Sequence, residues 1–142
     1  MNSVSQDLWP DDIVDAVSTT PASILKVQAG RLGQKTKNLV QGQVETSAAS
    51  GRLVHSFKLI APALDNYTYE LLRISHGVTL YPIKVEEEPI KASKVRFADM
   101  GGKKVPGHWL QNEGELIDWL REALSAPQTR RIVGSLVSQS AA

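Results

Sequence analysis

The residues of this chain best suited to acid–base chemistry or metal binding are its histidines, His55, His76 and His108. Their spacing matches no metal-binding motif, and the chain has no cysteine to act as a thiolate ligand or nucleophile. The sequence also lacks a G-x-S-x-G elbow, an H-E-x-x-H pair, a phosphate-binding P-loop and a dinucleotide fingerprint. We therefore predict no catalytic residue, no metal site and no cofactor, and we favour binding over catalysis.

One set of residues could still form a small-molecule site. His55 lies on the apolar side of a predicted strand, where a hydrogen-bonded core histidine is the favoured interpretation and a pocket acid, base or ligand the alternative. Tyrosines and an arginine on neighbouring strands could line an aromatic, partly basic surface, although ordinary cross-strand packing also explains them. The candidate ligand-binding residues are His55, Tyr69, Arg73 and Tyr81.

The charge distribution suggests a second kind of site. The net charge is only +1, but residues 1–15 carry aspartates and no basic residue, whereas residues 16–64 are basic. This asymmetry favours either an anionic partner or an acidic N-terminus that faces the basic segment in the fold. For nucleic acid or another polyanion, the predicted phosphate-binding residues of the basic 24–58 segment are Lys26, Arg31, Lys35, Lys37, Arg52 and Lys58.

A run of predicted strands must position these residues. Short apolar segments rich in Val, Leu, Ile, Phe and Tyr alternate with turn signals between Leu39 and Val85, as in an antiparallel meander. Alternation along the second segment places His55 and Phe57 inward and Lys58 outward. The predicted strands are Leu39–Thr46, Leu53–Ile60, Tyr67–Ser75 and Val78–Val85.

Helices are predicted on both sides of this meander. Thr20-Pro21 is a helix start with Thr as N-cap and Pro in the first turn, and Gly33 is a plausible end. Asn112 with Glu115 predicts a capping box at the start of a second helix, and Pro127 begins a third. Asp11 or Asp12 could open a short helix near the N-terminus.

Three finer expectations concern the end of the meander. His76-Gly77 is expected to form a two-residue hairpin turn that places Leu72 opposite Tyr81. The run Glu86–Pro89 is expected to be a solvated turn. Lys94–Phe97 is expected to add a short fifth strand, followed by a loop over Met100–Gly107.

Together these patterns predict an α+β, two-layer fold with a four- to five-stranded antiparallel meander, N-terminal helices and two C-terminal helices. We expect residues 1–142 to form a single domain with frayed ends at 1–8 and 138–142. The leading functional hypothesis is a small cytoplasmic module that binds a protein partner or itself through partly apolar residues on the second sheet face. No membrane contact is expected, because no apolar run is long enough to span a bilayer.

Overall fold

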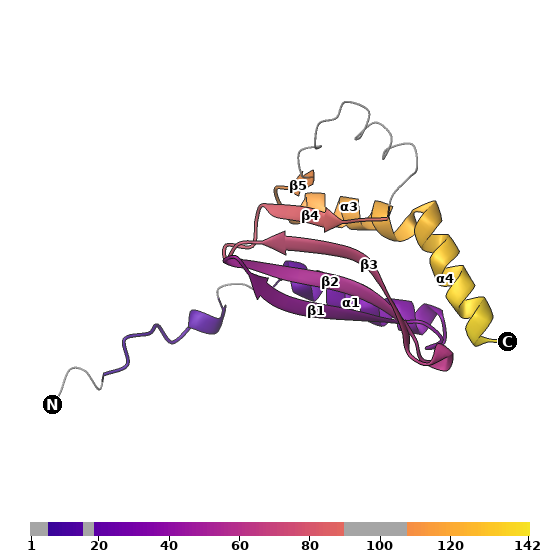
Figure 1. Ribbon diagram of the computed structural model, residues 1–142. Helices are drawn as coiled ribbons and strands as arrows, with labels where there is room; N and C mark the ends of the chain where they lie inside the picture. Colours follow the sequence, from indigo (N-terminus) through magenta and orange to yellow (C-terminus); the bar gives the residue numbers. More distant parts are fainter. Residues whose placement is uncertain (1–5, 16–18, 90–107) are drawn as a thin grey trace, which may run out of the picture.

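The computed structural model describes residues 6–15, 19–89 and 108–142 and confirms the α+β, two-layer prediction. Within these residues a five-stranded antiparallel sheet forms one layer, with strands in the order β1-β2-β3-β4-β5. Helices α1, α3 and α4 form the other layer and lie on one face of the sheet (Figure 1). The opposite face, called the outer face below, carries no described helix.

The strands follow one another in space as they do in sequence. Their bounds are β1 Gln41–Ala49, β2 Arg52–Ala61, β3 Tyr67–His76, β4 Ile83–Glu87 and β5 His108–Leu110. The β1–β2 hairpin closes through Ser50 and Gly51, both at positive φ, so these strands extend further toward the turn than predicted. A bulge in the β2–β3 pairing between Phe57 and Lys58 lets Leu71 and Leu72 both point into buried surroundings.

The helices begin where the sequence predicts. In α1 (Pro21–Lys35) the Thr20 hydroxyl accepts from the Ser23 N–H, and the helix continues past Gly33 to Lys35. In α3 (Glu113–Ser125) the Asn112 side chain accepts from the Glu115 N–H, while the Glu115 carboxylate accepts from Gln111 N–H, one residue outside the usual box. Helix α4 (Pro127–Ser140) follows directly and extends into the expected frayed end.

The predicted hairpin at His76-Gly77 is wrong. Residues 77–82 form a wider connection, in which the Leu80 N–H donates to the Gly77 carbonyl, and β4 pairs His76 with Ile83 and Ile74 with Val85. Pro82 explains the change, because it has no N–H for the ladder and the strand begins directly after it. The solvated turn predicted for Glu86–Pro89 is wrong for the same reason. Because β4 begins later in the sequence than expected, it extends to Glu87 and includes Glu86.

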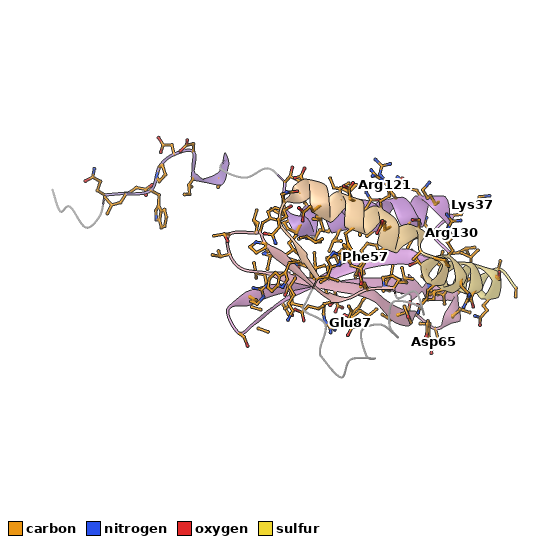
Figure 2. All side chains as sticks on the ribbon, turned by 90° about the horizontal axis from the view of Figure 1, so that it is seen from above. Lys37, Phe57, Asp65, Glu87, Arg121 and Arg130 are labelled. Carbon is orange, nitrogen blue, oxygen red and sulfur yellow. The ribbon has the colours of Figure 1, made fainter. Side chains whose placement is uncertain are left out.

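Other differences lie near the chain's less regular parts. The short N-terminal helix is limited to a 3-10 turn at Ile13–Asp15. The strand expected at Lys94–Phe97 and the loop over Met100–Gly107 lie outside the described residues. Residues 6–15 extend away from the two layers in both views (Figures 1 and 2).

The core lies between the layers. Phe57, Leu59 and Leu72 from the sheet are almost fully buried against Leu25 of α1 and Leu116 of α3. Helix α1 approaches β1 closely at one point: a Cβ placed on Gly42 would lie 2.6 Å from the Ala29 Cα. This contact between small residues sets the height of α1 above the sheet. None of the described helices is long and apolar enough to cross a membrane.

Candidate binding groove and buried histidine pair

His55 is buried in the core layer and hydrogen-bonded, as the favoured interpretation predicted. Its Nδ1 lies 2.8 Å from the Thr46 hydroxyl, and its Nε2 lies 2.8 Å from Nε2 of His76, which the sequence analysis had assigned to a turn. His76 Nδ1 lies 2.6 Å from the Gly77 carbonyl. Because a carbonyl only accepts, His76 carries its proton on Nδ1, His55 donates from Nε2, and Thr46 donates to His55. In this arrangement every ring nitrogen of the pair is hydrogen-bonded, in one chain of hydrogen bonds.

The environment of this pair keeps His55 uncharged. Burial first, then the neighbouring His76 and finally Lys26 of α1 lower the pKa of His55 from 6.5 to about 4. At neutral pH His55 is therefore uncharged, and both of its ring nitrogens are hydrogen-bonded. This arrangement suits a polar element of the core.

The other candidate ligand-binding residues lie in different surroundings. Arg73 is on the outer face, where it donates to Glu70 and Glu87. Tyr69 borders a cavity of about 460 Å³ between β3 and α4. The Tyr81 hydroxyl is buried without a hydrogen-bond partner among the described residues, and burial, followed by Glu113, raises the pKa of this phenol.

The six candidate phosphate-binding residues are divided between the two layers. Lys26, Arg31 and Lys35 are exposed on α1, and Lys37 is exposed just after it. Lys58 is on the outer face and forms an ion pair with Glu45. Arg52 is on the same outer face, where it donates to Ser75 and its guanidinium carbon lies 5.6 Å from the centre of the Trp109 ring.

The outer face is more polar than the sequence suggested. Its half-buried apolar residues, Val54 and Ile60, lie among ion pairs that join neighbouring strands. Arg73 of β3 and Glu87 of β4 form one of them, at 3.4 Å. Among the described residues of this face, Trp109 is the large apolar side chain that is well exposed, at 41%.

An apolar concave surface lies on the helix layer instead. A cavity of about 510 Å³ separates α1 from α4 above Phe57 and Leu59, and a second of about 310 Å³ continues it between α1 and α3. Both cavities are bordered by Gln28 and Leu124, so they form one continuous depression, called the helix groove below. Its residues are Ile24, Gln28, Arg31, Leu32, Lys35, Phe57, Leu59, Leu71, Ile117, Leu120, Arg121, Leu124, Ser125, Thr129, Arg130, Val133 and Gly134.

One face of α1 forms the first wall of the helix groove. Ile24, Gln28 and Leu32 recur at four-residue spacing, and Arg31 and Lys35 lie beside them. From Ile24 to Lys35 this wall is about 16 Å long, because a helix rises ~1.5 Å per residue. The wall is therefore an apolar stripe whose far half is bordered by positive charge.

The opposite wall depends on the corner between α3 and α4. The buried Thr129 hydroxyl donates to the Ala123 carbonyl at 2.6 Å, and Arg130 Nε donates to the Ser125 carbonyl at 3.1 Å. These bonds tie the first turn of α4 to the last turn of α3 and bring Leu124 and Val133 to the same groove. These hydrogen bonds therefore fix the orientation of α4 relative to α3, and the two helices together form the second wall.

The charged residues at the groove are all cations. Arg31, Lys35, Arg121 and Arg130 are exposed there, and no acidic side chain is among the described residues that border it. Figure 2 shows Arg121 and Arg130 on the helix layer, Phe57 between the layers and Glu87 on the other side of the sheet. Asp118 lies 3.5 Å from Arg121 and partly offsets its charge, and both side chains are highly exposed.

Sequence reasoning identified Arg31 and Lys35 but missed the groove that they border. The missed residues include Leu32, Leu124 and Val133. In the sequence these residues belong to the apolar stripes of their helices. Such a stripe predicts which side of a helix is buried, but it does not predict the distance between two helices.

Other site types have less support in the described part of the chain. Its histidine, aspartate and glutamate side chains do not gather in threes in a way that could hold a metal ion. Comparison with known proteins adds no assignment: no family model, no curated protein and no solved structure matches this chain.

Proposed function

We propose that this protein is a binding module that holds an acidic, amphipathic segment of a partner protein in the helix groove. The observation that supports this most directly is the combination of an apolar, concave surface with cations and no described acidic residue at its border. Concave apolar surfaces with a few convergent polar groups are the usual form of binding sites. The proposal keeps the cytoplasm as the place of action, because a chain without cysteine requires no oxidising compartment to fold.

The shape of the groove favours a peptide segment as its occupant. Half-buried Leu32, Leu124 and Val133 offer apolar contacts along its length, so an occupant gains by burying apolar side chains there. A length of about 16 Å corresponds to roughly three helical turns. An amphipathic helix that lays its apolar side into a groove is a common mode of peptide recognition.

The charges favour an acidic partner. Carboxylates on the polar side of such a segment would lie near Arg31, Lys35 and Arg130, whose partners in the described structure include no acidic side chain. The cations of the outer face differ, since Lys58, Arg73 and Lys84 already pair with glutamates. Electrostatic complementarity at the groove would raise the association rate and exclude basic partners.

The test uses the full chain and a labelled synthetic peptide of about 12 residues, which as a helix is about 18 Å long. The peptide carries leucine at helical spacing and glutamate elsewhere, and fluorescence anisotropy measures its binding. The double substitution Arg31→Glu/Lys35→Glu is expected to weaken binding about tenfold or more, because it reverses the charge of one groove wall.

A matched control separates the groove from general charge. Lys26→Glu/Lys37→Glu changes the net charge equally and alters exposed residues of the same region that do not border the groove. This variant is expected to bind within about twofold of the unchanged protein.

Two results would overturn the proposal. Equal losses in the two double variants would show that only overall charge matters. Binding of a single-stranded oligonucleotide but not of the peptide, again lost in Arg31→Glu/Lys35→Glu, would identify the groove as a polyanion site instead.

A further inference from the structure

Residues 6–15, called the N-terminal segment below, expose an unusual amount of apolar surface. Leu8 is 83% exposed, Trp9 is 72% exposed and Val14 is 83% exposed, with Ile13 half exposed. Two hydrogen bonds of this segment are local: Trp9 N–H donates to the Asp7 carboxylate, and Ile13 N–H donates to the Pro10 carbonyl. Large apolar side chains gathered in solvent usually mark a surface that is covered in another state.

We propose that the N-terminal segment binds in the helix groove of its own chain and competes there with the partner segment. The inference rests on the proposed function, because both require a groove that accepts an acidic, amphipathic peptide. It goes further by naming an occupant within the chain and a means of regulating access.

Composition supplies the first argument. The segment combines large apolar side chains with Asp7, Asp11, Asp12 and Asp15 and contains no basic residue. The groove combines half-buried apolar walls with Arg31, Lys35, Arg121 and Arg130. The two surfaces therefore carry opposite charges, and both offer apolar side chains that can pack against each other.

Length supplies the second argument. Residues 16–19 join the segment to Thr20, the N-cap of α1, and an extended chain spans about 3.5 Å per residue. The nearest groove residue, Ile24, lies only one helical turn beyond Thr20, about 6 Å along the axis. The segment itself spans about 15 Å if helical and more if extended, which is enough to follow the groove.

The tether also favours binding within one chain over exchange between two copies. A short link keeps the segment near the groove at an effective concentration in the millimolar range. Trp9 and Ile13 then serve as the apolar anchors, with the aspartates near the cations of the far half of the groove.

The absence of cysteine permits a clean test by disulfide trapping in the full chain. The pair Ile13→Cys/Leu32→Cys joins the segment to the groove wall. The control pair Ile13→Cys/Gln43→Cys uses an exposed residue of the outer face, on the other side of the sheet. Under mild oxidation we expect the first pair to close within one chain about tenfold faster than the control, as seen by mobility on non-reducing gels.

A second measurement tests competition. Trp9→Ser/Ile13→Ser is expected to tighten binding of the synthetic acidic peptide about tenfold, because the anchors no longer hold the segment in place. Val78→Ser is the matched control, since it removes another highly exposed apolar side chain from a different part of the molecule.

The outcomes separate this inference from the proposed function. Trapping no faster than the control, with peptide affinity unchanged in Trp9→Ser/Ile13→Ser, would overturn the inference while groove binding stands. Trapping within one chain, with no peptide binding even in Trp9→Ser/Ile13→Ser, would support occupation of the groove by the segment and overturn the partner proposal. Disulfides formed mainly between two chains would overturn binding within one chain.

Discussion

Lowering the pH should reduce the free energy of unfolding of this protein through protonation of His55, by an amount that follows from the pKa shift. In the folded chain the pKa of His55 is lowered to about 4 from 6.5, the ordinary value that applies once the chain unfolds. Between these values the unfolded state binds a proton that the folded state does not. Stability is therefore fully present above pH 6.5 and is lost as the pH falls toward 4.

The size of the effect follows from the shift. One pKa unit corresponds to about 1.4 kcal/mol, so the full loss is about 3 kcal/mol, of which about 2 kcal/mol falls between pH 7 and pH 5. His55 is 3% exposed, so solvent screens the added charge little. The groups that face it are His76 on β3, Thr46 on β1 and Lys26 on α1, and none of them carries a negative charge to stabilise the protonated ring.

Equilibrium urea unfolding at pH 7 and pH 5 measures this loss. Other groups titrate in the same range, so the informative quantity is the difference between the unchanged protein and His55→Gln, which keeps a polar side chain but cannot take up the proton. We expect the unchanged protein to lose about 2 kcal/mol more than the variant over this interval. Equal losses in both proteins would refute the assignment of the pH sensitivity to His55.

Four substitutions test the packing and capping of the helices that form the groove walls. Gly42→Val should lower the free energy of unfolding by about 1–3 kcal/mol, because its side chain would collide with the backbone of α1; Gly30→Ala, which meets nothing within 4 Å, should instead raise it by about 0.5–1 kcal/mol, and both are measured by urea unfolding. Asn112→Ala should cost about 1 kcal/mol in the same assay through loss of the N-cap of α3, and an unchanged midpoint would contradict this role. Thr129→Val should cost about 1 kcal/mol, because the Ala123 carbonyl loses the hydrogen bond from the Thr129 hydroxyl and keeps only the 3.4 Å bond from the Ala126 N–H; amide hydrogen exchange should then rise first at the α3–α4 corner.

Much of the fold follows from local patterns. Alternation in β2 placed His55 and Phe57 inward, and both are buried. Thr20-Pro21 and Asn112 marked helix starts because capping is satisfied by side chains close in sequence. These features depend on neighbours within a few residues, which is the range that a single sequence displays.

The failures involve contacts at longer range. The register of β3 against β4 depends on the residue at which pairing resumes after Pro82. The sequence from Val78 to Val85 does not identify that residue. His76 was assigned to a turn by its neighbour Gly77, whereas its partner His55 lies 21 positions away along the chain. The helix groove depends on the separation between α1 and α4, which arises from packing and from the corner at Thr129.

The close contact between Gly42 and Ala29 has a consequence for engineering the molecule. Because α1 rests on β1 at a point without a side chain on the strand, the volume added at one position sets how far one groove wall stands from the sheet. Gly, Ala, Ser and Val at position 42 would form a series of increasing side-chain volume, and each larger side chain would move α1 further from the sheet. Peptide affinity measured across this series would then show the groove width at which the ligand binds most tightly.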